Sequence, residues 1–565
     1  MQMSSQPKRY TVTAALPYTN GPIHIGHLAG VYIPADIFAR YKRLTNNDVA
    51  FICGSDEHGV AISLASKKAS ISPKELIDKY DKIIKNSFDK FGILFDNYSR
   101  TSSKVHHETS LNFFDNLREK NLFSLIKSEQ FFDVDENQFL ADRYISGTCP
   151  VCGFDEAYGD QCEKCGSTLS PEELINPKST ISNSSPILKE TKHYYIKLDE
   201  FEEFIRNWIT VENKDKWKTN VVGQVKSWLD SGLKPRAVTR DLDWGIPVKI
   251  EDEDGKVLYV WFEAPIGYIS STIEWAKAND KDWEQYWKNP ETNLIHFIGK
   301  DNIVFHCIIF PIMLRMFGDF ILPKNVPANE FLNLEGNKIS TSKNWAVWLH
   351  EYLIDFPNMQ DVLRYVLTST CPETKDNDFT WKDFQVRNNS ELVAIYGNFT
   401  NRVLSLINKY YDGKIPSTKS KNKHDQIVLS EVETLRGKIE DNLDNFKFRE
   451  AIKSLMNISR VGNKHLAETE PWKIKESDPE RVKQILNTSF VIISYIAILS
   501  EPFLPFTSVK LKNMIGLSNS SWDDMNNMSD NINYDFKIND IEILFKKIED
   551  SEIEYQIDKL KQGSN

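Results

Sequence analysis

The sequence has few cysteines and no long apolar run, and both scarcities limit what the chain can be. Seven of its 565 residues are cysteine, which argues against a disulfide-built domain and favours a reducing compartment. The longest apolar stretch, FVIISYIAIL, falls well short of the roughly 20 residues that span a bilayer, so it predicts a buried helix. No apolar stretch typical of a signal peptide follows Lys8 and Arg9, so we expect no signal peptide. We therefore expect a cytoplasmic protein without a membrane partner.

An excess of positive charge is also missing. The formal net charge is -11, which argues against a chain coated in basic residues but leaves room for a local basic face that binds nucleic acid. The hydrophobic fraction of 41% and the charged fraction of 26% are typical of a globular protein. A chain of 565 residues exceeds one ordinary core, so several structural units are expected.

Strand and helix patterns alternate near the start of the chain. YTVTAAL and DVAFICGSD read as apolar strands, and IGHLAGVYIPADIFARYKRL reads as a helix between them, an order that predicts a parallel α/β sheet. Pro34 removes one backbone hydrogen bond from this helix, so we expect a kink or a late helix start. From about Arg387 onward the apolar residues follow a helical spacing. We divide the chain at 1–121, 122–235, 236–330, 331–386 and 387–565, where 122–235 interrupts the α/β pattern.

Four cysteines form a compact cluster in CPVCGFDEAYGDQCEKCG. Two CxxC pairs each chelate from a tight turn, and four thiolates suit tetrahedral zinc with no open position for water. A redox-active CxxC is the alternative, but two pairs this close favour the metal. The cluster therefore predicts one structural Zn²⁺ site, which contributes folding energy rather than catalysis. Its ligands are Cys149, Cys152, Cys162 and Cys165.

Two histidines, His24 and His27, lie where the first strand gives way to a helix. A metal site would need further ligands nearby, and nucleophilic catalysis would need a Ser or Cys partner that the stretch does not suggest. A helix N-terminus attracts anions, so two imidazoles there suit a phosphate group, and Gly26 lets a flat base approach the backbone. Ordinary packing of the histidines is the alternative.

A second candidate phosphate group lies far along the chain, in LEGNKISTSKN. Lys338 sits there among small and polar residues, which is typical of a loop that closes over phosphates. A solvated surface loop has the same composition. The loop therefore indicates a phosphate site only in combination with the histidine pair.

These motifs together carry a family resemblance. PYTNGPIHIGH resembles the HIGH signature of class I aminoacyl-tRNA synthetases, and KISTS resembles their KMSKS loop. AALPYTNGPIHIGH, FICGSDEHG, YVWFEAPIGY, HFIGKDNIVFH, EPW and the four-cysteine cluster occur in matching order from about Tyr10 to about residue 550. As a set they resemble the methionyl-tRNA synthetase family.

The resemblance implies a domain plan. A Rossmann-like catalytic domain would comprise 1–121 and 236–330, and the zinc-knuckle insertion would divide its two halves. Residues 331–386 would hold the KMSKS-like loop and a region that contacts the tRNA stem. Residues 387–565 would form an all-α helical bundle that binds the anticodon.

The resemblance also implies a reaction and its site. ATP, with Mg²⁺, and L-methionine would give methionyl-adenylate and pyrophosphate, and the methionyl group would pass to the terminal ribose of initiator or elongator methionine tRNA. Such chemistry needs positioning and charge stabilisation more than acid–base groups. His24, His27 and Lys338 would be catalytic. The ATP site would comprise Gly26, His24, His27, Lys338, Ser340, Thr341 and Ser342.

Two binding surfaces follow from the same match. A thioether has no charge to recognise, so its pocket needs an apolar slot and polar groups for the amino acid's backbone. The matched residues are Ala15, Leu16, Tyr18, Trp261, Ala264, Pro265, Tyr268 and His306, with Asp56 for the ammonium group. The anticodon would be read by Asn398, Arg402 and Trp472, which suit an unpaired base stacked on a ring. Core packing is the alternative for each aromatic taken alone.

The chain departs from the family pattern in three places. Thr341 stands where the KMSKS loop usually has its second lysine, and we hypothesise that Lys343 substitutes for it. Phe310 stands where the family often has tryptophan, so the pocket wall is expected to differ. The C-terminal module of many members does not follow the helical part, so we expect a monomer.

Other functions remain to be weighed against this one. The leucine, isoleucine and valine enzymes carry a large editing insertion, whereas the insertion here is short and holds the cysteine cluster. The cysteine enzyme would place zinc ligands in its active site. A nucleotidyltransferase without tRNA would not need the helical C-terminal part, and a non-catalytic RNA-binding relative would not need His24, His27 and Lys338 together.

Overall fold

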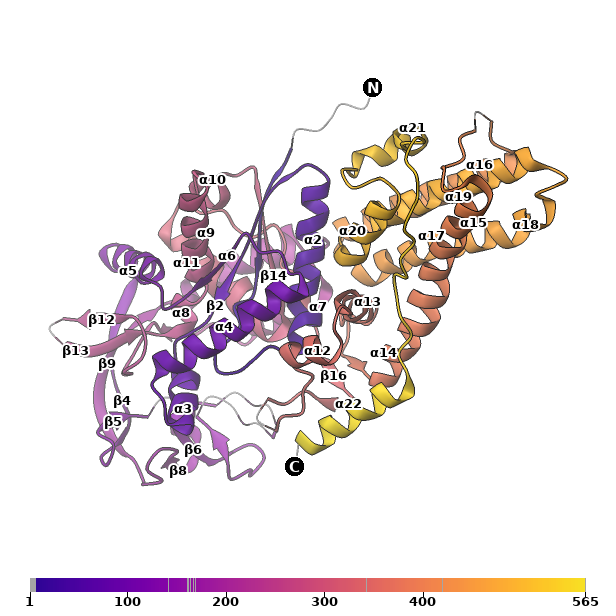
Figure 1. Ribbon diagram of the computed structural model, residues 1–565. Coiled ribbons are helices and arrows are strands. Elements are labelled where there is room, and N and C mark those ends of the chain that lie inside the picture. Colours follow the sequence, from indigo (N-terminus) through magenta and orange to yellow (C-terminus); the bar gives the residue numbers. More distant parts are fainter. Residues whose placement is uncertain are drawn as a thin grey trace.

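The computed structural model describes residues 7–140, 142–159, 162, 164, 165, 167, 169–251, 253–341, 343–418 and 420–563. Ser342, expected at the ATP site, lies outside the described residues. Figure 1 shows an α/β half in indigo to magenta beside a helical half in orange to yellow. The helix α22 (Asp550–Gly563) returns from the helical half toward the α/β half.

A five-stranded parallel sheet organises the α/β half, in the order β15-β14-β1-β2-β3. The chain leaves β1 toward β2 on one side and returns through β14 on the other, so the strand order reverses at β1. A crevice opens beside the carboxyl ends of the strands at such a point. The strands are β1 (Arg9–Ala14), β2 (Asp48–Ser55), β3 (Asn97–Arg100), β14 (Thr292–Gly299) and β15 (Ala328–Asn329).

Helices cover both faces of this sheet. The first one does not run unbroken, because α1 (Ile25–His27) passes into a π-helical segment at Leu28–Tyr32 before α2 (Ile33–Leu44) begins. Pro34 is the second residue of α2, so the expected late start is confirmed. The other helices of this half are α3 (Val60–Ala69), α4 (Pro73–Phe91), α5 (Lys104–Glu119), α8 (Val260–Glu263), α9 (Ile266–Ala278), α10 (Glu284–Trp287) and α11 (Phe310–Phe317).

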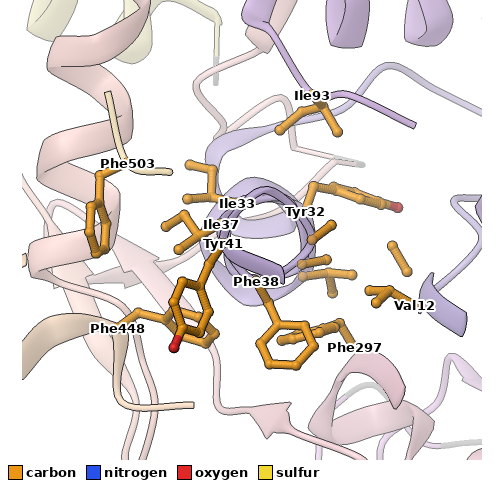
Figure 2. Close-up of a cluster of buried hydrophobic side chains, with 14 of the residues drawn as sticks. Val12, Tyr32, Ile33, Ile37, Phe38, Tyr41, Ile93, Phe297, Phe448 and Phe503 are labelled. Atoms are coloured by element: carbon orange, nitrogen blue, oxygen red, sulfur yellow. The ribbon is translucent and has the colours of Figure 1, made fainter. Parts of the chain in front are cut away.

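Helix α2 lies between the sheet and the helical half. Figure 2 looks along this helix and shows Val12 and Phe297 of the sheet on one flank, with Phe448 and Phe503 of the helical half on the other. The two halves therefore share one buried hydrophobic core. Such continuity holds them in one fixed orientation.

The insertion expected between the two α/β segments is mostly antiparallel sheet. A four-stranded sheet comprises β4 (Phe123–Asp133), β5 (Gln138–Phe139), β9 (Ile187–Ile196) and β10 (Arg236–Ala237). The cysteine cluster lies beside β6 (Ile145–Thr148), β7 (Ala157–Tyr158) and β8 (Ile175–Ser179). Helices α6 (Glu202–Asn207) and α7 (Thr219–Asp230) follow, then β11 (Thr239–Arg240), β12 (Pro247–Ile250) and β13 (Glu253–Leu258).

A small sheet and a helical bundle complete the chain. The sheet has β16 (Leu332–Leu334), β17 (Asn337–Lys338) and β18 (Asn377–Phe379), with α12 (Leu349–Asp355), α13 (Gln360–Ser369) and α14 (Trp381–Arg387) beside it. The bundle has α15 (Asn398–Tyr411), α16 (Lys423–Asp444), α17 (Phe448–Thr469), α18 (Pro471–Ile474), α19 (Pro479–Leu499), α20 (Pro505–Met514) and α21 (Met528–Asn531). Helix α19 is long and apolar enough to cross a membrane, yet 89% of its most apolar window is buried inside the protein.

Candidate active site

A cavity of about 1190 Å³ lies beyond the carboxyl ends of β1 and β2. It is lined by most of the residues expected at the ATP and methionine sites, from segments more than 300 positions apart in the sequence. Among the described residues of those two sets, Ser340 is the one that does not line it. The lining residues from the two sets are Ala15, Leu16, Tyr18, His24, Gly26, His27, Asp56, Trp261, Ala264, Pro265, Tyr268, His306, Lys338 and Thr341.

His24 and His27 cap the start of α1 reciprocally. The Gly26 amide donates to His24 Nδ1 at 3.1 Å, and the His24 amide donates to His27 Nδ1 at 3.2 Å. The two rings stack with centroids 3.7 Å apart. A Cβ at position 26 would lie 2.9 Å from His24 Cε1, so only glycine fits between the rings and the cavity.

These hydrogen bonds determine which ring nitrogen carries the proton. Each Nδ1 accepts from a backbone amide, so in the neutral ring the proton is on Nε2. Burial lowers the pKa of His27 to about 4, and burial followed by the neighbouring His27 lowers the pKa of His24 well below its usual value. At neutral pH, therefore, both imidazoles are neutral and each offers one Nε2–H donor.

We call residues 334–344, which contain Lys338, the lysine loop. Backbone hydrogen bonds join the segment after this loop to the stretch that contains His24 and His27. The Ile25 amide donates to the Val347 carbonyl at 3.1 Å, and the Leu349 amide donates to the Ile23 carbonyl at 2.8 Å. Between them, the Trp348 ring lies 5.9 Å from the His24 ring. The loop is thus anchored at its C-terminal end directly on the start of α1.

The lysine loop itself folds as a tight connection. The amides and carbonyls of Ser340 and Trp345 exchange hydrogen bonds of 3.0 and 2.9 Å, which closes the loop on itself. Lys338 is exposed and lines the cavity, as does Thr341. Lys343 is also exposed but is not among the lining residues.

Asp56 also lines the cavity, follows β2, and is held by backbone hydrogen bonds to the chain leaving β1. Its amide donates to the Pro17 carbonyl at 2.9 Å, and its carbonyl accepts from Thr19 at 3.0 Å. The side chain is 5% exposed, and its Oδ1 has no hydrogen-bond partner among the described residues. Burial is the main cause that raises the pKa of Asp56, and the nearby Glu263 carboxylate raises it further. This buried oxygen lacks a cationic partner, which an ammonium group would supply.

Tyr268 and His306 form the polar part of an otherwise apolar wall. His306 Nδ1 lies 3.0 Å from the Asn302 carbonyl, so this nitrogen carries the proton and Nε2 accepts from the Tyr268 hydroxyl at 2.8 Å. Burial lowers the pKa of His306 to about 4, so the ring is neutral. A neutral, mutually hydrogen-bonded pair on this wall suits an uncharged side chain.

The four clustered cysteines meet the geometry of a tetrahedral metal site. Their Sγ atoms all lie within 4.8 Å of one another, with 3.9 Å between Cys149 and Cys165 and 3.6 Å between Cys152 and Cys162. Zinc–sulfur bonds of about 2.3 Å in a tetrahedron place the sulfur atoms about 3.8 Å apart. The donor set therefore fits a zinc ion.

Comparison with known proteins identifies the family. The model of class I tRNA synthetases of the methionine type matches residues 10–404, and that of the anticodon binding domain of methionyl tRNA ligase matches 415–563. The chain belongs to this family. The methionine–tRNA ligase of Flavobacterium johnsoniae is 59% identical over 99% of this chain and 82% of its own length. That of Bacteroides fragilis strain YCH46 is 59% identical over 99% of this chain and 81% of its own length.

Solved structures of the same family share the fold. A methionyl-tRNA synthetase from Mycobacterium tuberculosis with bound methionyl-adenylate superposes with a TM-score of 0.78 at 22% identity. The match covers 95% of this chain and 100% of that one. The comparison confirms the predicted fold, which consists of a Rossmann-like domain, a zinc-knuckle insertion and a helical C-terminal domain.

The three residues expected at the anticodon lie together on the helical domain. Asn398 is exposed at the start of α15, and Arg402 follows one turn later on that helix. The Arg402 guanidinium lies 5.3 Å from the Trp472 ring centroid, and Trp472 of α18 is 40% exposed. An exposed ring beside a cation and an amide is a surface on which a base can stack.

Sequence reasoning missed several residues of the cavity wall. Asp301 and Asn302 follow β14 and line the cavity, although HFIGKDNIVFH was recognised as a motif and could have pointed to them. Trp348 lies beyond the KISTS motif and carries no signal of its own. Only its pairing with the His24 stretch places it in the site.

Proposed function

We propose that the chain ligates L-methionine to methionine tRNA through a methionyl-adenylate. A methionine carboxylate oxygen attacks the α-phosphorus of ATP, the bond to the bridging oxygen breaks, and pyrophosphate leaves. The 3′-terminal ribose hydroxyl of the tRNA then attacks the methionyl carbonyl, and AMP leaves. The single observation that carries this proposal is one cavity with two anion-binding motifs near one another and a buried, partnerless carboxylate oxygen at Asp56.

The phosphates would lie against α1 and the lysine loop. His24 and His27 each direct a neutral imidazole with one free N–H toward the cavity, and the helix start adds its own positive end. Lys338 would balance the charge of departing pyrophosphate. Mg²⁺ bound to ATP would neutralise part of the phosphate charge. Ser340, Thr341 and Ser342 belong to the same loop, and we assign them to the ATP site on that basis.

Methionine would lie at the opposite end of the cavity. Asp56 would hold the ammonium group, while Tyr268 and His306 would present a neutral polar edge beside Ala15, Leu16 and the Trp261–Pro265 segment. Tyr18 hydrogen-bonds to Asp56 and is 45% exposed, so it is placed to cover the bound amino acid. A neutral edge discriminates against charged side chains because burying an unpaired charge is costly.

The helical domain would read the anticodon, with Asn398, Arg402 and Trp472 as its contacts. Initiator and elongator methionine tRNAs carry the same anticodon, so we infer that both are substrates. The zinc knuckle would hold the insertion together, and we infer that the chain acts in the cytoplasm. Residues 331–386 would link the two tRNA-binding parts.

Amino-acid-dependent ATP–pyrophosphate exchange tests the first step. Exchange should require methionine, and exchange with leucine in its place would overturn the proposal. Methionine-dependent AMP release tests the second step. It should rise on addition of methionine tRNA and should not rise with a tRNA whose anticodon has been replaced.

A further inference from the structure

A second pairing of a ring and a cation lies next to the Arg402–Trp472 pair. The Lys475 Nζ lies 4.9 Å from the ring centroid of Tyr410, and the Lys409 Nζ lies 5.9 Å from the same centroid. Lys475 directly follows α18, which carries Trp472, and Tyr410 lies near the end of α15, which carries Arg402. Both pairs therefore bridge the same two segments.

The spacing of the two pairs suits two different nucleotides. Arg402 and Tyr410 are eight residues apart on α15, which corresponds to about 12 Å along the helix axis. Lys475 lies three positions after Trp472 on the facing segment. Trp472 therefore contacts α15 near Arg402, about two helical turns before Tyr410.

Several exposed lysines lie close to Tyr410, although the chain as a whole is acidic. Lys409, Lys414 and Lys475 are exposed, whereas the net charge of the chain is -11. Carboxylates lie among these lysines, and Glu480 is close enough to raise the pKa of the neighbouring Tyr411. Asp412 is paired with Lys537 at 2.9 Å, and the Glu476 side chain lies 3.6 Å from Lys475 but is 91% exposed, so it can turn away into solvent. A local basic face is what an acidic protein needs to bind an RNA backbone.

We propose that Tyr410 and Lys475 form a second nucleotide-binding subsite, which holds a base of the anticodon loop that neighbours those read at Arg402 and Trp472. Tyr410 is half-buried against the core, so the base stacks on the exposed part of its ring, and Lys475 neutralises the adjoining phosphate. A ring that stacks a base is tolerant of its identity, so this subsite contributes affinity rather than anticodon specificity. The inference rests on the proposed tRNA-binding function of the helical domain.

Direct binding of a synthetic anticodon stem–loop RNA to the full chain tests the subsite. Lys475→Ala should weaken binding about tenfold and lower the slope of log K against log salt by about 0.7, because one phosphate contact is lost. Tyr410→Leu should weaken binding about tenfold, while Tyr410→Phe keeps the ring and should bind within twofold of the wild type. Lys438→Ala, at an exposed lysine of α16, is the matched charge control and should bind like the wild type.

Two further measurements distinguish a failure of the Tyr410–Lys475 subsite from a failure of the proposed anticodon-binding role of the helical domain. Methionine-dependent pyrophosphate exchange should be unchanged in all four variants, because the subsite lies outside the catalytic cavity. Trp472→Ala should abolish discrimination between stem–loops of methionine and altered anticodons, while Lys475→Ala should weaken both equally. Wild-type binding by both Lys475→Ala and Tyr410→Leu, with binding lost in Trp472→Ala, would overturn the subsite alone. Wild-type binding by Trp472→Ala as well would overturn the anticodon role of the domain.

Discussion

Gly26 and Ile339 bring the two phosphate-binding motifs into contact. A Cβ at position 26 would lie 3.1 Å from Ile339 Cδ1 and 2.9 Å from His24 Cε1, tighter than ordinary van der Waals contact. Ile339 belongs to the lysine loop, which lies more than 300 residues later in the chain. The start of α1 and the loop therefore meet at a point where a single methyl group does not fit.

The Gly26→Ala variant tests this contact. The added methyl should displace the His24 ring or the loop, and we expect adenylate formation to fall at least tenfold because small displacements of catalytic groups are costly. Gly223→Ala in α7 is the control, since a Cβ there meets nothing within 4 Å and Gly223 does not line the cavity. Equal exchange rates in the two variants would show that the contact is dispensable.

Asp56→Asn tests the ammonium site. The substitution keeps the shape but removes the charge, so the KM for methionine in pyrophosphate exchange should rise about a hundredfold. The KM for ATP should change little, because Asp56 is not part of the proposed ATP site. Asp48→Asn, at the start of the same strand and paired with Arg9, is the control. A methionine KM within threefold of the wild type would remove Asp56 from the site.

Lys343→Ala tests whether Lys343 compensates for Thr341, which stands where the KMSKS loop usually has its second lysine. If Lys343 replaces the missing lysine, adenylate formation should slow far more than methionine binding weakens. Because Lys343 does not line the cavity, the loop must move to bring it in. Lys338→Ala should slow the same step and serves as the reference. An unchanged exchange rate in Lys343→Ala would exclude the compensating role.

Metal analysis tests the zinc knuckle. The purified chain should contain about one zinc ion, and Cys149→Ser should lose it, because a three-thiolate site holds the metal less tightly. Cys307→Ser changes a buried cysteine outside the cluster and should keep the zinc. Full zinc content in Cys149→Ser would contradict the assignment of the ligands.

Stability should depend on pH through His306. Burial lowers its pKa to about 4 in the folded protein, against roughly 6.5 when unfolded. Between these values the unfolded chain takes up a proton that the folded one does not, so the free energy of unfolding falls as the pH falls from 6.5 toward 4. This residue alone should cost roughly 2 kcal/mol at pH 5 relative to pH 8.

Urea unfolding at pH 8 and pH 5 measures this dependence. The His306→Gln variant has no titrating group at the site, so the difference between the two pH values should be smaller than in the wild type. The comparison uses differences because the variant also alters the hydrogen bond from Tyr268. Identical differences in both proteins would mean that His306 does not titrate as inferred.

Local patterns in the sequence predicted much of the fold. The helical spacing predicted from about Arg387 onward corresponds first to a π-helical segment at Asn388–Gly397 and then to α15, which ends at Tyr411. Apolar residues keep a helical spacing as far as Phe446, but α16 ends at Asp444 and Phe446 adopts a positive φ of 56°. The exact end was not predictable, because the Phe446 ring packs 5.0 Å from Phe38 of α2, a contact between distant segments.

The sequence by itself determined the chemical groups available: two imidazoles at a helix start, four thiolates at chelating spacing, and a lysine in a short polar loop. These are local properties, and side-chain type and near-neighbour spacing are enough to express them. Tertiary structure decided which groups work together. Parallel strand order placed Asp56 beside the end of β1, backbone pairing placed Trp348 over His24, and burial made His24 and His27 neutral donors. Each of these depends on contacts between residues far apart in the chain and on the exclusion of water, which no local pattern encodes.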